Sequence, residues 1–425
     1  MTIEVQIPGS KSITNRALLL AALSKGKTEI KNIGVCDDTM YMIRGLKKLG
    51  VKIENKGEDL VVHGTDGKFP KKDITTMIFT GNAGTATRFL AAASTLTGNK
   101  IEIIGNLRMN KRPIGDLVKA LNSLGAKVES KKDCTPLTIH PKKLEGGNTN
   151  LTSNISSQYL SALLMVSPFA KTETTINIEG ALVSKPYIEM TIKIMEKFGI
   201  EILNNNFAQF EIKKAKPSIN KPKSLVIESD TSSASYIGAF AALNPKIKIL
   251  LKNIHENSIQ GDIKFLEYLQ TMGCKTSTTK NGIIIQGPAK LLPLGSLDMN
   301  TTPDLVMTFA VLSMFTEGKT TLANIGNLRV KESDRLSALK TEIRKFGIQV
   351  HTGPDFIEIH GNLKLLSSKP KSPITIETYD DHRIAMAFGI LKNHLPIKIQ
   401  NPSCVNKSYK TFWLDLNKLI QNAKR

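Results

Sequence analysis

Cysteine, arginine and aromatic residues are scarce in this chain of 425 residues, and it contains no long hydrophobic run. Its four cysteines, Cys36, Cys134, Cys274 and Cys404, lie far apart and form no CxxC pair, which argues against a disulfide framework or a zinc site. The apolar run that begins at Ala17 is much shorter than the roughly 18 residues needed to span a membrane. The N-terminal sequence MTIEVQIPGS has an acidic residue and lacks a cleavable signal pattern. We therefore predict a cytoplasmic protein without membrane association, or a plastid protein lacking its transit segment.

The formal net charge of the chain is +21, and the shortage of aromatic residues limits what this charge indicates about function. A positive charge of this size suggests nucleic-acid binding, but the chain has one Trp and seven Tyr and no stripe of alternating basic and aromatic residues that could stack bases. Its lysines are spread over the whole sequence. The charge is equally compatible with acidic small-molecule substrates or with a bias in composition.

Arginine accounts for only ten of the 58 basic residues, which leaves 48 lysines, and none lies between Arg112 and Arg329. We expect such a chain to keep arginine where a planar fork must bind a carboxylate or phosphate through two hydrogen bonds. Five arginines in the motifs described below are therefore of particular interest: Arg16, Arg88, Arg112, Arg335 and Arg383.

The chain repeats one pattern, in which an amphipathic helix ends at a hydrophobic residue followed by glycine and then a short strand. The glycines are Gly50, Gly125, Gly199, Gly273 and Gly347, at spacings of 75, 74, 74 and 74 residues. Each lies where a helix end requires a left-handed residue. A sixth copy would end near residue 421, in the segment SYKTFWLDLNKLIQN.

A second class of helix alternates with the first and is apolar nearly all round, so we expect it to be buried. These helices start near residues 12, 85, 157, 232, 304 and 382, with polar residues suited to capping in their first turns. The repeat therefore predicts six units of two helices and about four strands, three in each of two similar domains. If the buried helices are parallel, their N-termini and free amides would favour anions in a cleft between the domains.

Several motifs contain basic, acidic, amide or hydroxyl residues, and some of them lie at these helix starts. They are PGSKSITNR from Pro8, TGNAGTATR from Thr80, KRPIG from Lys111, SSQ from Ser156, SKPYI from Ser184, TTPDL from Thr301, RVKESDR from Arg329, DHRIAM from Asp381 and NPSCVNKSY from Asn401. The glycines of the second motif let a backbone approach a ligand closely, but the motif does not match a P-loop.

Taken in this order, the motifs resemble the 5-enolpyruvylshikimate-3-phosphate synthase family of enolpyruvyl transferases from Pro8 to about Lys407. The resemblance implies an α/β fold of two similar domains, each with three βαβαββ repeats around buried parallel helices (an inside-out α/β barrel). One domain would span residues 12–228 and the other residues 1–11 and 229–425, with the active site in the cleft between them. Hinges are expected near Lys11–Ser12 and Ser229–Asp230.

The resemblance also implies a reaction. The enolpyruvyl group of phosphoenolpyruvate would pass to the 5-hydroxyl of shikimate 3-phosphate by addition and elimination, releasing phosphate, in aromatic amino acid biosynthesis. Neither a metal nor a cofactor is expected, and the enzyme would be a monomer that binds these anionic substrates and no nucleic acid.

Site residues are carried over from the family by motif. The residues expected to bind shikimate 3-phosphate are Lys11, Ser12, Arg16, Ser156, Ser157, Gln158, Ser184, Tyr187, Asp304, Asn327 and Lys331. Those expected to bind phosphoenolpyruvate are Lys11, Gly84, Arg112, Arg335, Arg383 and Lys407, with Asn82 and Thr85 lining the pocket. Asp304 is the expected base for the 5-hydroxyl, and Glu332 and Lys11 are the candidates for proton transfer at the methylene carbon, with His382 assisting.

Other interpretations remain open at this point. Asp304 could be a helix cap, Glu332 could form a surface pair with Arg335, and His382 could be a capping residue. Asp37, Asp38 and Asp230 are interpreted as caps or hinge residues.

Two positions depart from the family pattern, since Thr87 replaces a methionine and Phe89 replaces a proline, which puts inhibitor sensitivity in doubt. Phe89 is expected at the edge of the pocket.

Two other functions are considered. One is that of the related family that transfers enolpyruvyl to UDP-N-acetylglucosamine, which has Lys-Asn where this chain has Lys11–Ser12. That family also carries a reactive cysteine in a loop near residue 115, whereas this chain has no cysteine between Cys36 and Cys134. A basic nucleic-acid-binding protein is the non-enzymatic alternative.

Overall fold

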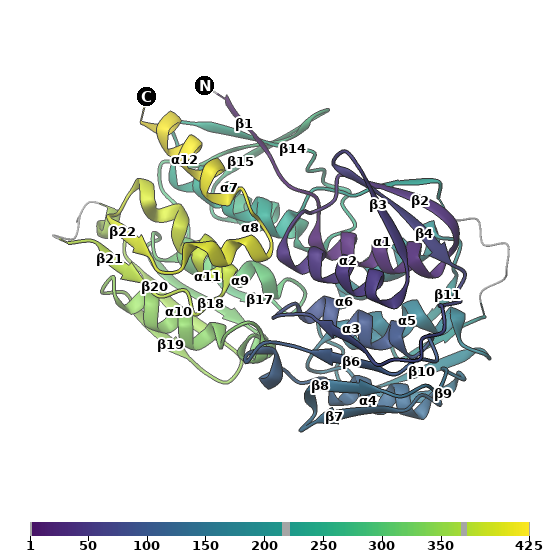
Figure 1. The fold of residues 1–425 in the computed structure, drawn as a ribbon. Helices are drawn as coiled ribbons and strands as arrows, with labels where there is room; N and C mark the ends of the chain where they lie inside the picture. The colour runs from purple at the N-terminus through teal and green to yellow at the C-terminus, as the bar shows by residue number, and fades with distance from the viewer. Residues whose placement is uncertain (1, 215–221, 367–371, 425) are drawn as a thin grey trace. The chain divides into compact units, whose positions relative to one another are not determined.

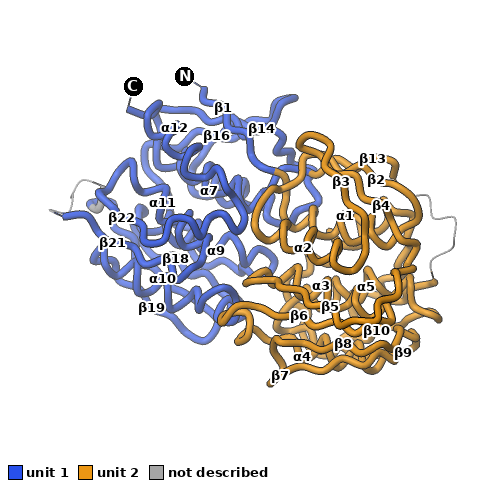
Figure 2. The backbone as a smooth tube through the Cα atoms, in the orientation of Figure 1, with its two compact units in different colours: residues 1–8, 228–425 blue, residues 9–227 orange. Residues whose placement is uncertain are grey.

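The computed structural model describes residues 2–214, 222–366 and 372–424. The chain divides into two compact units, unit 1 with residues 1–8 and 228–425 and unit 2 with residues 9–227 (Figure 2). These boundaries differ by a few residues from those expected. Pro8 belongs to unit 1, where its carbonyl accepts a hydrogen bond of 2.8 Å from Asp230 N. Gly9 belongs to unit 2, where a Cβ added to it would lie 1.8 Å from the Asn32 carbonyl oxygen.

Six of the helices in the described residues are buried along almost their whole length, at the positions that the repeat predicts (Figure 1). They are α1 (Lys11–Leu23), α3 (Gly84–Ser94), α5 (Ser157–Val166), α7 (Thr231–Leu243), α9 (Val306–Ser313) and α11 (His382–Gly389). In unit 2, helices α1, α3 and α5 contact one another, and in unit 1 helix α9 contacts α7 and α11. Each unit therefore has its buried helices at the centre of its core.

The amphipathic helices alternate with the buried ones. They are α2 (Asp37–Leu49), α4 (Gly115–Ser123), α6 (Lys185–Lys197), α8 (Phe265–Thr271), α10 (Arg335–Arg344) and α12 (Phe412–Ala423). All five glycines of the repeat have the left-handed conformation expected at these helix ends, with φ between 74° at Gly199 and 101° at Gly50. Because this region of φ is unfavourable for residues with a Cβ, the glycines end the helices at a fixed position.

Each unit contains three sheets. In unit 2 their strand orders are β13-β2-β4-β3, β5-β6-β8-β7 and β11-β12-β10-β9, and in unit 1 they are β1-β14-β16-β15, β17-β18-β20-β19 and β21-β22. The strands of unit 2 are β2 (Lys25–Lys31), β3 (Lys52–Lys56), β4 (Asp59–Thr65), β5 (Thr76–Phe79), β6 (Ile101–Ile104), β7 (Val128–Lys131), β8 (Cys134–Ile139), β9 (Gly147–Thr152), β10 (Thr174–Glu179), β11 (Ile202–Asn205), β12 (Gln209–Ile212) and β13 (Ser224–Val226). Those of unit 1 are β1 (Thr2–Gln6), β14 (Lys248–Lys252), β15 (Lys275–Thr279), β16 (Gly282–Gln286), β17 (Gly295–Asp298), β18 (Gly318–Ala323), β19 (Gln349–Thr352), β20 (Ile357–Gly361), β21 (Ile374–Ile376) and β22 (Ile397–Ile399).

The strands before α1 and α7 are exchanged between the units. Elsewhere, the strand before a buried helix pairs in parallel with the strand after it, as β5 does with β6 across α3. In contrast, β1 precedes α1 but pairs with β14 of unit 1 (Figure 1). Correspondingly, β13 precedes α7 but pairs with β2 of unit 2. This exchange requires the chain to pass between the units twice.

The sixth repeat is shorter than expected, since its described residues form a sheet of only two strands, β21 and β22, in place of four. Across the described part of the chain, no helix combines the length and the apolar character that crossing a membrane requires.

Candidate active site

The N-terminal turns of the three buried helices of unit 2 lie together. Gln158 Nε2, in the first turn of α5, donates to Thr85 Oγ1 in the first turn of α3 at 3.1 Å. Arg16 Nη2 of α1 donates to Ser161 Oγ of α5 at 3.2 Å. Within this unit the helices therefore point in the same direction and present their positive ends together, an arrangement that favours anions.

The guanidinium group of Arg16 is buried and fixed by four acceptors. Nε donates to Thr191 Oγ1 at 2.7 Å, Nη1 to the Ser12 carbonyl at 2.9 Å, and Nη2 to Ser161 Oγ and to the Tyr187 carbonyl at 3.2 and 3.3 Å. Burial lowers the pKa of Arg16 to about 10, so the group is still charged at neutral pH. All four acceptors are neutral, and this buried charge is therefore well suited to pair with an anionic ligand.

Phe89 is fully buried, and the Arg16 guanidinium lies 5.4 Å from the centre of its ring. The prediction that Phe89 lies at the edge of the pocket is therefore wrong, because the ring packs in the core beneath a charged group.

Lys11 begins α1, where its Nζ lies 3.2 Å from Asp38 Oδ2. The interpretation of Asp37 and Asp38 as caps is wrong, because Cys36 is the N-cap of α2 and both acids lie in its first turn, where the buried Asp38 forms an ion pair with Lys11. Asp230 is a cap as predicted, because its Oδ1 accepts from Ser233 N at the start of α7 at 2.8 Å.

Two guanidinium groups converge on Gly84, the first residue of α3. A Cβ added to Gly84 would lie 2.6 Å from Arg112 Nη2 and 2.6 Å from Arg88 Nη1. Arg88 also donates to the Gly84 carbonyl at 3.0 Å, and Arg112 Nη1 donates to the side chain and carbonyl of Asn82 at 3.1 Å. The absence of a side chain at Gly84 thus allows two positive charges close to a helix N-terminus.

The remaining predicted residues of unit 2 lie at the starts of α5 and α6. Ser156 caps α5 by accepting from Gln158 N at 3.3 Å, and Ser157 is the first residue of this helix. Gln158 Oε1 is buried and has no hydrogen-bond partner among the described residues. Ser184 precedes α6 with φ 55°, a left-handed conformation that is uncommon for residues with a side chain and often occurs at functional sites.

In unit 1, Arg335 at the start of α10 is surrounded by three carboxylates. Its Nε donates to Asp381 Oδ2 at 2.8 Å, its Nη2 to Glu332 Oε2 at 2.8 Å, and its Nη1 to Asp304 Oδ1 at 3.1 Å. Burial opposes the charge of Arg335, but the carboxylates of Asp381, Glu332 and Asp304 more than offset it, and the pKa of Arg335 lies above its usual value.

Two further cations complete this cluster. Arg383 Nη2 donates to Asp304 Oδ2 at 2.6 Å, and Lys407 Nζ lies 3.8 Å from Glu332 Oε1. Arg335, Arg383 and Lys407 are each less than 10% exposed. Three cations and three carboxylates thus form one connected network, in which the acids offset the charge of the cations without a ligand.

Two of the alternative structural roles, the caps at Asp304 and His382, are wrong, and the third holds only in part, since Glu332 pairs with Arg335 but in a buried position. Asp304 lies inside the 3₁₀ helix η4 (Pro303–Leu305), and its side chain bonds to two arginines. Glu332 precedes α10 and is buried, so its pair with Arg335 is not on a helix surface. The cap of α11 is Asp381, whose Oδ1 accepts from Arg383 N, and His382 is the first helical residue.

Asn327 lies in η5 (Gly326–Val330), and both polar atoms of its side chain are buried without a hydrogen-bond partner in the described part of the chain. Lys331 follows this helix directly. Because buried amide groups normally form hydrogen bonds, Asn327 is well suited to receive a polar ligand.

The sequence assigned no role to Asp381, Thr191 and Asp262, which lie at or near the predicted site residues, whereas Arg88 was expected as one of the arginines in the motifs. Asp381 and Thr191 hold Arg335 and Arg16, and Arg88 approaches Gly84. Asp262 is buried, its carboxylate accepts from Ser232 Oγ, and burial together with the charge of Asp304 raises its pKa to about 7. Asp381 and Arg88 lie inside recognised motifs, whereas no sequence signal marks Thr191 or Asp262.

The structure thus brings the predicted residues together in two groups, one in each unit. In unit 2 the residues at or near the starts of helices are Lys11, Ser12, Arg16, Gly84, Ser156, Ser157, Gln158, Ser184 and Tyr187, and Arg112 lies beside Gly84. Unit 1 gathers Asp304, Asn327, Lys331, Glu332, Arg335, Arg383 and Lys407. In the described residues, no three His, Cys, Asp or Glu side chains are grouped so that they could hold a metal ion.

Comparison with known proteins extends these observations. A family profile described as EPSP synthase (3-phosphoshikimate 1-carboxyvinyltransferase) matches residues 1–416. A 3-phosphoshikimate 1-carboxyvinyltransferase of Shewanella denitrificans is 42% identical over 426 residues, covering 99% of this chain and 97% of the relative. A Marinomonas protein of the same name is 42% identical over 418 residues, covering 96% of this chain and 95% of the relative. The solved structure of an EPSP synthase from Acinetobacter baumannii is similar in fold, with a TM-score of 0.80 at 23% identity, covering 98% of this chain and 95% of the other.

Proposed function

The chain belongs to the EPSP synthase (3-phosphoshikimate 1-carboxyvinyltransferase) family, and from this premise we propose its reaction and the residues that perform it. The enzyme transfers the enolpyruvyl group of phosphoenolpyruvate to the 5-hydroxyl of shikimate 3-phosphate and releases phosphate. In the addition step the methylene carbon gains a proton and the 5-hydroxyl oxygen bonds to the neighbouring carbon. In the elimination step the intermediate loses phosphate and a proton from the new methyl group.

The observation that carries the proposal is the buried network of Arg335, Arg383 and Lys407 with Asp304 and Glu332. The two substrates together carry about five negative charges at neutral pH, since each phosphate contributes about −1.5 to −2. Burial of such anions is unfavourable unless each is paired. Cations that are held by carboxylate partners keep their charge when buried and can exchange these partners for the anionic groups of a ligand.

We assign shikimate 3-phosphate to residues at the helix starts of unit 2 and to the polar groups around Asp304. The proposed ligands are Lys11, Ser12, Arg16, Ser156, Ser157, Gln158, Ser184, Tyr187, Asp304, Asn327 and Lys331. Support comes from the buried Gln158 Oε1 and Asn327 amide atoms, which have no hydrogen-bond partner among the described residues, and from the buried Arg16 charge with its neutral acceptors.

Phosphoenolpyruvate is assigned to a set of cations and one glycine. The proposed ligands are Lys11, Gly84, Arg112, Arg335, Arg383 and Lys407, with Asn82 and Thr85 lining the pocket. Support comes from the guanidinium of Arg112, which approaches the Gly84 backbone where a side chain would prevent it. Arginine forks suit both the carboxylate and the phosphate of this substrate.

Asp304 is the proposed base for the 5-hydroxyl, because its carboxylate is partly exposed while two arginines hold it in place. Glu332 and Lys11 are the proposed groups for proton transfer at the methylene carbon, and His382 assists. Glu332 forms ion pairs with Arg335 and Lys407. Its carboxylate therefore lies next to two cations that are also proposed to bind the substrate, where it can donate or accept a proton.

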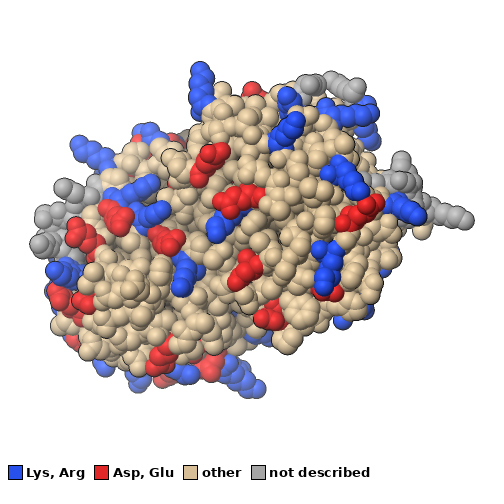
Figure 3. All heavy atoms as spheres, turned by 180° about the vertical axis from the view of Figure 1, so that it is seen from behind, with Lys and Arg blue, Asp and Glu red and all other residues tan. Residues whose placement is uncertain are grey.

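We also propose that the protein acts as a monomer in the cytoplasm and binds no nucleic acid. The chain supplies all the residues that the proposal uses. On the face drawn in Figure 3, basic and acidic side chains are interspersed and the basic ones do not gather into one patch, unlike a surface that follows a phosphate backbone.

The proposal is tested by measuring phosphate release from phosphoenolpyruvate, with and without shikimate 3-phosphate, in metal-free buffer. We expect release only with both substrates and a fall in kcat/KM of about 10²–10⁴-fold in Asp304→Ala, the range for general base catalysis. Asp355→Ala, which removes an exposed acid of the same unit, is the control and should retain activity. Phosphate release with UDP-N-acetylglucosamine but not with shikimate 3-phosphate would assign the protein to the related family. No phosphate release with either acceptor would refute the enzymatic function.

A further inference from the structure

A hollow of about 400 Å³ lies in unit 2 at the other end of the buried helices, away from the predicted site residues. Ser24 caps the C-terminus of α1, Leu96 follows the end of α3, and Pro168 and Phe169 follow α5, and all four line the hollow. Because α1, α3 and α5 carry the site residues in their first turns, the hollow is a separate cavity at their opposite ends. Its volume lies within the range of about 300–1,000 Å³ that is usual for small-molecule sites.

The lining is unusually rich in lysine, even for this chain. Five of its 13 residues are lysine, whereas lysine makes up 48 of 425 residues overall (58 Lys+Arg less ten Arg), so only one or two would be expected. They are Lys25, Lys68, Lys143, Lys171 and Lys214, and they come from segments that are distant in the sequence. The fold therefore concentrates positive charge around the hollow.

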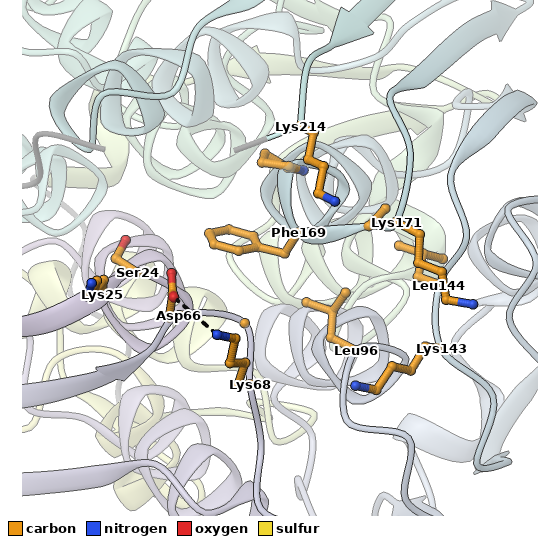
Figure 4. A pocket seen from close by; sticks show the side chains of 13 residues that line it. Ser24, Lys25, Asp66, Lys68, Leu96, Lys143, Leu144, Phe169, Lys171 and Lys214 are labelled. Carbon is orange, nitrogen blue, oxygen red and sulfur yellow. Dashed lines mark ion pairs between the residues drawn. The ribbon is translucent and has the colours of Figure 1, made fainter. Parts of the chain in front are cut away.

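Only two of these lysines have a carboxylate nearby among the described residues. Lys171 pairs with Glu145 at 2.6 Å, and Lys68 lies 3.9 Å from Asp66, the one acid in the lining (Figure 4). Lys25, Lys143 and Lys214 form no ion pair with another described residue. With two acids against five lysines, the hollow has a surplus of about three positive charges.

The base of the hollow is apolar and contains an aromatic ring. Figure 4 shows Phe169 near the middle of the lining, with lysine side chains on several sides of it, and Leu96 and Leu144 also line the hollow. The ring is held in place because Gly67, with φ 66°, packs on it, and a Cβ at Gly67 would lie 3.2 Å from Phe169 Cδ1. Leu96, Leu144 and Pro168 are buried, while Phe169 is partly exposed, so one face can accept a flat apolar group.

We propose that this hollow binds a small molecule with one flat ring system and two or more negative charges. The ring would pack on Phe169 and the apolar base, and the charges would lie among Lys25, Lys143 and Lys214. The negative groups could be the phosphates of a nucleotide or the carboxylates of an aromatic acid, since both combine a ring with several negative charges. The inference does not depend on the proposed reaction, because no residue of the hollow takes part in it.

Isothermal titration with four probes tests the proposal on the full chain, in saturating shikimate 3-phosphate so that the proposed site for this substrate is filled. ADP supplies a ring and phosphates, benzene-1,3,5-tricarboxylate a ring and carboxylates, pyrophosphate only charge, and adenosine only a ring. We expect saturable binding of ADP, of the tricarboxylate or of both, tighter than that of pyrophosphate or adenosine and weaker at high salt. The ring-bearing probe that binds more tightly shows whether the negative groups of the ligand are phosphates or carboxylates.

Variants locate the binding. For the preferred probe, Lys143→Gln should raise Kd about threefold to fivefold, as for a partly exposed ion pair. The triple variant Lys25→Gln, Lys143→Gln, Lys214→Gln should raise it more than about tenfold. Phe169→Leu should weaken both ring-bearing probes and leave pyrophosphate unchanged. The control Lys142→Gln removes a neighbouring exposed lysine that does not line the hollow and should bind as the parent does.

Three results would overturn the proposal: no saturable binding of either ring-bearing probe, equal binding by the parent and the triple variant, or pyrophosphate binding as tight as that of both ring-bearing probes. If the triple variant melts at a lower temperature while the parent binds no probe, the lysines only offset the negative ends of α1, α3 and α5. Unchanged phosphate release in the variants would show that they are correctly folded.

Discussion

Arg335 Nε donates to Asp381 Oδ2 at 2.8 Å, and both side chains are almost inaccessible to solvent, with exposures of 1% and 0%. This bond fixes one edge of the guanidinium, while its remaining nitrogen atoms contact Asp304 and Glu332. Asp381 also accepts from Ser333 Oγ and caps α11. A residue without an assigned catalytic role therefore holds both α11 and the arginine that we expect to contact the substrate.

Replacement of Asp381 by asparagine should destabilise the protein by about 3 kcal/mol, because it leaves Arg335 without its most buried partner. Phosphate release should also fall, since the guanidinium loses its orientation. Urea denaturation and steady-state kinetics measure the two effects. The adjacent Asp380 is exposed and bonds only to Asn401 among the described residues, so Asp380→Asn is a matched control, and equal losses in both variants would contradict the role of Asp381.

Gly84→Ala should raise the KM for phosphoenolpyruvate by about tenfold, equivalent to about 1.4 kcal/mol. The added Cβ would lie 2.6 Å from both Arg112 Nη2 and Arg88 Nη1, and these flexible side-chain ends can move away without unfolding the helix. The KM for shikimate 3-phosphate should change by less than about twofold, since Arg16 has its own partners. A parallel rise in both KM values would show a general distortion of unit 2 and refute this assignment.

Thr191→Val should raise the KM for shikimate 3-phosphate by at least about fivefold, with little effect on the KM for phosphoenolpyruvate. The substitution removes the hydroxyl that accepts from Arg16 Nε at 2.7 Å and donates to the Tyr187 carbonyl at 2.8 Å. An unpaired buried donor costs about 1–3 kcal/mol, and Arg16 would reorient. Thr191→Ser keeps the hydroxyl and should restore the parental KM; failure of this rescue would mean that Thr191 acts only through packing.

Asp262→Asn should change how stability depends on pH. Burial and the nearby charge of Asp304 raise the pKa of Asp262 to about 7, so the folded protein takes up a proton between about pH 4 and pH 7 that the unfolded chain does not hold. The contribution of Asp262 to stability is therefore present below about pH 4 and is lost as the pH rises to 7.

The side chain of the asparagine variant does not titrate, so the variant does not lose stability as the pH rises. Its free energy of unfolding relative to that of the parent should therefore rise between pH 4 and pH 7 and then level off. We expect a change of at least about 1 kcal/mol, because a tenfold change in proton affinity corresponds to about 1.4 kcal/mol. Urea midpoints measured across this pH range test the prediction. A difference that is independent of pH would show that Asp262 is ionised throughout.

The sequence alone determined the repeat, the two classes of helix and the helix ends. These features depend on neighbours within one or two turns, as in the apolar surface of α7, the left-handed Gly125 and the cap at Asp230. Such local preferences do not depend on the rest of the fold. The spacing and types of the residues were therefore sufficient to predict these features. The motifs predicted the family in the same way, because each is a short run of residues that are neighbours in the sequence.

Only the tertiary structure decided which charges meet. Asp38 was interpreted as a cap or hinge residue, and the structure shows its ion pair with Lys11; Asp304 bonds to Arg383, which is 79 positions away in the sequence. The exchange of β1 and β13 and the lysine-lined hollow of unit 2 also join segments that are far apart in the sequence. Contacts of this kind depend on how whole elements pack, and no periodicity in the sequence records them.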